Sequence, residues 1–148
     1  MKSLDTNLLF VACNAKAEGH EICRELLLEW SNKQDVVICE LVLTEVYNLL
    51  RNPTVMSNHP LSADQAVKVI RRFRHHPRWR LVENAPVMEQ VWEYAKEASF
   101  PRRRVFDARI ALTLLHHGVH EFATVNLKDF QTFAFRKIWN PLVPSKRH

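Results

Sequence analysis

Glycine is scarce in this chain of 148 residues, which contains only Gly19 and Gly118. Loops that cradle phosphates with backbone groups, such as the P-loop and the dinucleotide-binding loop, need several closely spaced glycines. Their absence excludes both kinds of loop and argues against nucleotide-cofactor chemistry.

Cysteine is also sparse, with three residues at positions 13, 23 and 39 and no C-x-x-C pair. An odd number of widely spaced cysteines indicates neither a disulfide framework nor a zinc knuckle. We expect them to act as small buried hydrophobic residues. The eight histidines show no H-E-x-x-H or other zinc spacing, which favours surface or helix-end roles.

Long apolar runs are missing, since no stretch approaches the roughly 20 apolar residues of a membrane-spanning helix. The chain also lacks a signal-peptide pattern, because Asp5 falls where the apolar region would begin. Repeats and low-complexity linkers are absent too. We therefore expect a cytoplasmic protein that does not contact membranes, folded as a single domain over residues 1–148.

Patterns typical of strands and helices alternate along the chain. Short apolar runs predict strands that end at Asp5 and that cover 36–39, 79–82 and 122–125. Helical spacing predicts helices over 21–30 and 41–50, one capped by Ser62, one from Pro86, and one from Asp107 to a cap at Gly118. This alternation predicts an α/β domain with a mainly parallel central sheet.

Basic residues exceed acidic ones by 21 to 16, a net charge of +5 that favours an anionic partner such as nucleic acid. One basic cluster covers residues 71–76, where an ordinary solvated helix face explains the pattern equally well. Another consists of Arg102, Arg103 and Arg104, just before Asp107. Trp79, between two arginines, is a candidate RNA contact, although a core role is commoner for tryptophan.

Acidic residues at special positions each have a plain explanation when taken singly. Asp107 in a first helical turn interacts favourably with the helix dipole. Glu45 lies beside an apolar stripe, where a basic side chain, a metal ion or solvent would satisfy it. Glu40 competes with Glu45 as a site acid, but it also suits a helix start. Clustered carboxylates need a compensating cation, and ligation by oxygen alone suits Mg²⁺ or Mn²⁺.

Four segments in order resemble the motifs of PIN-domain ribonucleases, in particular the VapC toxins of type II toxin–antitoxin systems. They are Leu4-Asp5-Thr6-Asn7, Leu43-Thr44-Glu45-Val46, residues 106–111 and residues 123–130. The resemblance implies a PIN-like three-layer α/β/α fold and an endoribonuclease that hydrolyses RNA phosphodiesters with metal-activated water. It also implies a VapB-like antitoxin as partner, and a homodimer.

Carried onto this sequence, the resemblance implies a Mg²⁺ or Mn²⁺ centre held by Asp5, Glu45 and Asp107, with Asp129 as a further catalytic residue. The chain departs from the family where an acid often follows the last strand, because Asn126 stands there and Asp129 comes three residues later. Whether Asp129, Asn126 or neither completes the site stays open. Residues proposed to orient ligands or substrate are Thr6, Asn7, Thr124 and Asn126.

Arg102, Arg103 and Arg104 are the candidate contacts to the RNA backbone or to an antitoxin. One alternative is a non-catalytic basic module of PIN fold that binds RNA or protein. A phosphotransferase of the haloacid-dehalogenase kind, with Asp5 as nucleophile, is weakened because Asn7 replaces the second Asp that this chemistry uses.

Overall fold

Five short parallel strands form the centre of the computed structural model, which describes residues 1–144. β1 (Lys2–Leu4) pairs with β4 (Glu121–Ala123), and β4 pairs with β5 (Lys137–Trp139). β2 (Val37–Cys39) pairs with β3 (Arg80–Val82). A parallel bridge between Lys2 and Val36 joins the two sets of strands. The predicted parallel sheet is confirmed, with all of its carboxyl ends at one edge.

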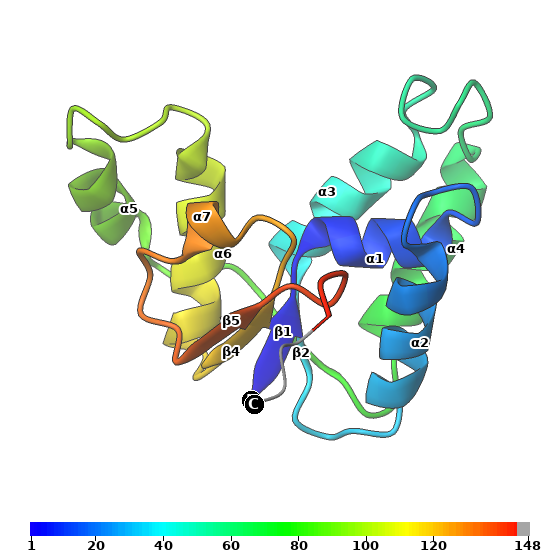
Figure 1. The fold of residues 1–148 in the computed structure, drawn as a ribbon, viewed down its shortest axis with the longest axis horizontal. Coiled ribbons are helices and arrows are strands. Elements are labelled where there is room, and N and C mark those ends of the chain that lie inside the picture. The colour runs from blue at the N-terminus through cyan, green and yellow to red at the C-terminus, as the bar shows by residue number, and fades with distance from the viewer. Residues whose placement is uncertain (145–148) are drawn as a thin grey trace.

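Helices flank the strands in two groups. α1 (Thr6–Cys13), α2 (His20–Trp30), α3 (Glu40–Leu50) and α4 (Ala63–Arg74) lie on one side, and α5 (Met88–Ala95), α6 (Arg104–His116) and α7 (Leu127–Phe130) lie on the other (Figure 1). Helices α3 and α5 rise beyond the carboxyl ends of the strands. The three-layer α/β/α arrangement expected from the sequence is therefore confirmed.

The core lies between the strands and these helices because the strands are apolar on both faces. Residues 36–39 of the β2 region are at most 1% exposed, and Leu4, Phe122 and Ala123 are buried beside them. Burial on both faces is typical of parallel sheets covered by helices. Cys23 and Cys39 are buried free thiols, as predicted, whereas Cys13 is a free thiol that is only partly buried.

Helix ends follow the local signals in the sequence. Ser62 caps α4 in a reciprocal capping box with Gln65, and Gly118 adopts a positive φ of 83° directly after the C-cap of α6. The structure corrects two boundaries, since α6 begins at Arg104 rather than Asp107, and α5 begins at Met88 rather than near Pro86. β5 and α7 were not predicted as a strand and a helix. Helix α7 has only four residues, and β5 is a partly exposed edge strand without a buried apolar run.

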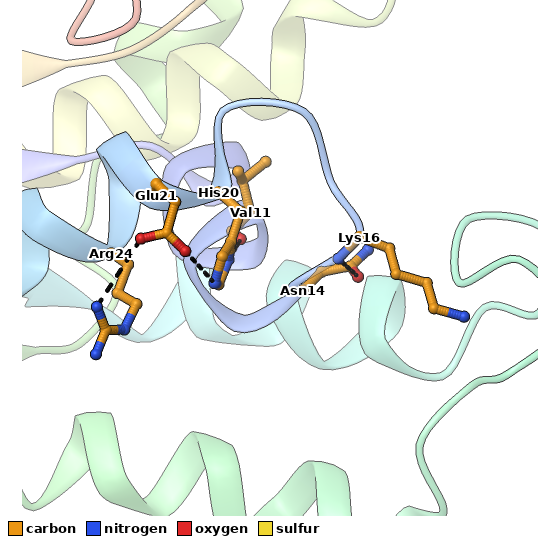
Figure 2. Close-up of polar contacts among 6 residues, drawn as sticks. All are labelled: Val11, Asn14, Lys16, His20, Glu21 and Arg24. Atoms are coloured by element: carbon orange, nitrogen blue, oxygen red, sulfur yellow. Dashed lines mark hydrogen bonds and ion pairs between the residues drawn. The ribbon is translucent and has the colours of Figure 1, made fainter.

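The connection between α1 and α2 is held by side chains (Figure 2). The His20 ring nitrogen Nδ1 donates to the Val11 carbonyl at 2.8 Å, and Asn14 Oδ1 accepts from the Lys16 N–H at 3.2 Å. This turn fixes α2 against α1. Across residues 1–144, no helix combines the length and apolarity needed to cross a membrane.

Candidate active site

Asp5 is held rigidly where β1 ends. Its N–H donates to the Ala123 carbonyl at 2.9 Å, which continues the ladder between β1 and β4. Its side chain accepts from the Thr6 N–H through Oδ1 and from the Thr124 hydroxyl through Oδ2, each at 2.8 Å. Only 5% of Asp5 is exposed. Two neighbouring strand ends therefore hold this buried carboxylate in one orientation.

Glu45 reaches the same place from the second turn of α3. The Thr6 hydroxyl donates to Glu45 Oε2 at 2.6 Å. Glu40, the competing acid, instead accepts from Arg74 Nε at 3.0 Å and lines a separate polar pocket. The structure thus places Glu45, and not Glu40, beside Asp5.

Asp107 enters the site from the first turn of α6 and is half-buried. Burial is the main reason why its pKa rises from 3.8 to about 7, and the negative charges of Asp5, Asp129 and Glu45 raise it further. The Arg104 guanidinium opposes this rise. The mutual repulsion shows that the four acids, which are far apart in the sequence, gather in one region.

The pKa of Asp5 rises for the same main reason. Burial raises it from 3.8 to about 6, although the hydrogen bonds from Thr124 and Thr6 lower it, and the charges of Glu45 and Asp129 add to the rise. Two carboxyls with raised pKa values in one region indicate negative charge that the side chains of residues 1–144 do not fully compensate.

Asp129 lies behind the cleft rather than in its wall. The Thr124 hydroxyl accepts from the Asn126 N–H at 3.0 Å, and this turns the chain into α7. Asp129 then pairs through Oδ1 with Arg104 Nη2 at 3.2 Å, with 41% of its side chain exposed. Asn126 lines the cleft, at the position where the family resemblance led us to expect an acid.

These side chains surround a cleft of about 380 Å³ at the carboxyl edge of the sheet. Its lining residues are Asp5, Thr6, Asn7, Glu45, Asn48, Leu49, Asp107 and Asn126. Sequence reasoning missed Asn48 and Leu49. Their signal was available, since they stand three and four residues after Glu45 and so share its helix face.

The three arginines near Asp107 have different surroundings. Arg102 and Arg103 are exposed, whereas Arg104 is half-buried in its pair with Asp129. Trp79 is only 7% exposed and donates its ring N–H to the Trp30 carbonyl at 2.9 Å. The suggested RNA contact at Trp79 is therefore wrong, because a core role takes up this side chain.

The cleft offers the donors that a hard divalent cation uses. Its ionisable groups are the carboxylates of Asp5, Glu45 and Asp107, and oxygen-only ligation suits Mg²⁺ or Mn²⁺. Among residues 1–144, no three His, Cys, Asp or Glu side chains converge to metal-holding distance as placed. The three carboxylates line one cleft, and their oxygen donors and negative charge suit a hard divalent cation.

Comparison with known proteins agrees with the fold and the motifs. A curated relative, Ribonuclease VapC24 of Mycobacterium tuberculosis, is 49% identical over 142 residues, which are 96% of this chain and 97% of the relative. Among solved structures, VapC20 of Mycobacterium tuberculosis, described as a toxin that cleaves the sarcin-ricin loop, matches with a TM-score of 0.68. That match has 16% identity and covers 89% of this chain and 95% of the other.

FitAcB of Neisseria gonorrhoeae also shares the fold, with a TM-score of 0.62, 21% identity, and coverage of 95% of this chain and 98% of the other. The family model described as the PIN domain matches residues 3–135, which include all four acids of the site. The chain therefore belongs to the PIN-domain family and is a homologue of the VapC ribonuclease toxins.

Proposed function

We propose that this protein is an endoribonuclease dependent on Mg²⁺ or Mn²⁺, and that it acts in the cytoplasm as the toxin of a toxin–antitoxin pair. PIN-domain VapC ribonucleases generally depend on divalent metal. The observation that carries the proposal is the gathering of Asp5, Glu45 and Asp107 around one cleft at the strand ends. We also propose that residues 1–148 work as one nuclease domain.

Asp5, Glu45 and Asp107 would hold the ion. When bound, such an ion activates water for attack and neutralises charge at the phosphodiester. Thr124 and Thr6 keep the carboxylates of Asp5 and Glu45 in fixed orientations, because each hydroxyl donates to one of them.

Three further residues have supporting roles in this proposal. Asn7 and Asn126 face the cleft, where an amide can orient substrate or water without adding charge. Asp129 assists from behind, because its pair with Arg104 sets the charge next to Asp107.

Arg102 and Arg103 are exposed beside the entrance of α6, and we propose that they contact RNA phosphates. The acidic cleft is equally suited to a basic residue from a VapB-like antitoxin, because a guanidinium would satisfy the same carboxylates. Blocking the cleft in this way would inhibit the enzyme. A homodimer completes the proposed assembly.

The decisive experiment measures cleavage of total tRNA and rRNA with Mg²⁺ or Mn²⁺ by the wild type and by Asp5→Asn. Glu93→Gln, on the exposed face of α5, is the matched control for loss of one carboxylate. Loss of an outer partner of a metal ligand typically lowers activity roughly 10–100-fold, so loss of Asp5 itself should exceed that. Full activity of Asp5→Asn would contradict the proposal.

A further inference from the structure

A second pocket of about 170 Å³ adjoins the acidic cleft and shares Glu45 with it. It lies between α3 and α6. Its lining residues are Leu41, Thr44, Glu45, Phe106, Arg109 and Ile110. We call it the side pocket. A group bound there would sit next to the proposed reaction centre, with only the Glu45 side chain between them.

Neighbouring residues of α6 line both the side pocket and the acidic cleft. Phe106, Arg109 and Ile110 stand at i, i+3 and i+4, so they share one helix face that borders the side pocket. Asp107, one residue after Phe106, lines the acidic cleft. One turn of α6 therefore serves the two sites together.

Phe106 is unusually open to solvent for an aromatic ring. It is 63% exposed, the highest value among the exposed large hydrophobic side chains of residues 1–144. Packing of the core does not explain it. An exposed ring beside the proposed reaction centre is suited to stacking on an RNA base. Such stacking is a main source of affinity in the recognition of single-stranded RNA.

Arg109 adds an uncommitted positive charge to the same pocket. It is half-buried, yet no carboxylate within residues 1–144 lies within 4.0 Å of its guanidinium. By contrast, Arg104 and Arg74 are both paired. A partly buried guanidinium without a partner favours a bidentate anion such as phosphate.

We propose that the side pocket holds one unpaired nucleobase of the RNA, next to the phosphate that is cleaved. Phe106 stacks on the base, and Arg109 binds the phosphate of the same nucleotide. This inference rests on the proposed function and names how its substrate is held. The pocket is smaller than the roughly 300–1,000 Å³ of drug-sized sites, which suits a single planar ring.

The pocket would hold the base by its face more than by its edge. The Thr44 hydroxyl already donates to the Glu40 carbonyl at 3.0 Å, and Leu41 and Ile110 offer no hydrogen bonds. Stacking accepts every base, so we expect little preference among bases at this position. A base inside a double helix cannot enter, so the RNA must be single-stranded here.

The test measures RNA binding separately from cleavage, in the Asp5→Asn background. Fluorescence anisotropy compares a labelled single-stranded RNA of ten nucleotides with the same RNA in a duplex. Phe106→Ala should weaken binding of the single strand about tenfold, as expected for loss of one stacked base, while Phe106→Trp should retain it. Arg109→Gln should weaken binding, and Arg109→Lys should recover only part of it.

A direct signal of stacking comes from RNA that carries 2-aminopurine, whose fluorescence is quenched when it stacks. We expect quenching with Phe106 or Phe106→Trp protein and its loss with Phe106→Ala. Trp92→Ala and Arg136→Gln change an exposed aromatic and an exposed arginine outside both sites, and they should behave as the parent protein does.

The outcomes separate the two proposals. If RNA affinity and quenching are unchanged in Phe106→Ala and Arg109→Gln, the side pocket does not hold a base, whether or not the wild type cleaves RNA. If these variants instead lose only inhibition by a co-expressed antitoxin, the pocket belongs to a protein partner and the inference is overturned. Equal cleavage by wild type and Asp5→Asn would refute only the proposed function, because the binding signals do not depend on turnover.

Discussion

The acidic centre has two halves that are held in different ways. In the threonine-held half, Asp5 and Glu45 accept hydrogen bonds from Thr124 and Thr6. In the arginine-balanced half, Asp107 and Asp129 lie close to the Arg104 guanidinium, which pairs with Asp129. Asp5 is 5% exposed, whereas the Asp129 side chain is 41% exposed.

The difference concerns where negative charge remains available. A neutral hydroxyl orients a carboxylate and leaves its charge for a cation, whereas a guanidinium neutralises much of that charge. The threonine-held half is therefore the better place for an ion. We therefore propose that Asp129 is the weakest candidate ligand and that it acts by positioning Arg104 near Asp107.

Among changes to the groups that hold the acids, removing the hydroxyl that orients Asp5 should have the largest effect. Thr124→Val deprives Asp5 of a donor and the Asn126 N–H of its acceptor, so RNA cleavage should fall roughly 10–100-fold. Unfolding in urea should show a loss of about 1–3 kcal/mol, because buried polar groups lose their partners.

Thr113→Val is the matched control for that change. Thr113 is equally buried, but its hydroxyl has no hydrogen-bond partner. Since no group within residues 1–144 bonds to the Thr113 hydroxyl, its replacement should leave activity unchanged and stability equal or higher. Similar losses of activity in the two variants would mean that the Thr124 hydroxyl does not orient Asp5.

Removing the positive charge from the other half should shift the pH dependence. Arg104→Gln takes away the charge that lowers the pKa of Asp107, so this pKa should rise further above about 7. Since the ionised carboxylate is needed, the acidic limb of the pH–activity profile should move to higher pH, with activity reduced several-fold at pH 7 and recovered near pH 9. The control Arg136→Gln should leave the acidic limb of the pH–activity profile unchanged. The same result for Arg104→Gln would show that Arg104 does not affect the pKa of Asp107 in the site.

The stability of the metal-free protein should fall as pH rises from about 4 to 7. The pKa values of Asp5 and Asp107 are raised to about 6 and about 7, so the folded chain binds more protons than the unfolded chain in this window. The melting temperature should drop by roughly 5 °C from this cause. Mg²⁺ or Mn²⁺ should restore it at pH 7.5 and not at pH 4.5.

Asp5→Asn tests which half produces that pH dependence. Because the pKa of Asp107 is raised to about 7 and that of Asp5 to about 6, Asp5→Asn should flatten the plot of melting temperature against pH less than Asp107→Asn does. The opposite ranking would place most of the uncompensated charge in the threonine-held half.

The smallest effect is expected at the acid that lies outside both halves. Glu40→Gln breaks only the half-exposed ion pair with Arg74, which contributes at most about 1 kcal/mol to stability. RNA cleavage should change less than about twofold, whereas Glu45→Gln should abolish most of it. Comparable losses in both would show that Glu40 belongs to the centre after all.

Local signals in the sequence predicted the parts of the fold that local physics determines. The β-branched run at 36–39, the Ser62 cap and the Gly118 cap all appear where their chemistry indicates. The parallel sheet also followed from the alternation of strand and helix patterns. Convergence of Asp5 with Glu45 and Asp107 came from family resemblance, since spacing carries no such information.

Contacts between residues far apart in the sequence determine the features that local patterns did not predict. Arg104 and Asp129 are 25 residues apart, and nothing local distinguishes Arg104 from its two neighbours. Trp79 is buried because the Trp30 carbonyl, 49 residues earlier, accepts its ring N–H. Strand β5 lies at the edge of its sheet and is only partly buried, so no buried apolar run marks it in the sequence.

The hydrogen bond between Asp5 and Thr124 joins residues 119 positions apart. A nascent chain on the ribosome therefore holds its first site acid long before the hydroxyl that orients it has been synthesised. No fragment that stops before β4 can complete the cleft, and such long-range closure also slows folding. The environment of Asp5 is therefore complete only after β4 and Thr124 have been synthesised and have joined β1.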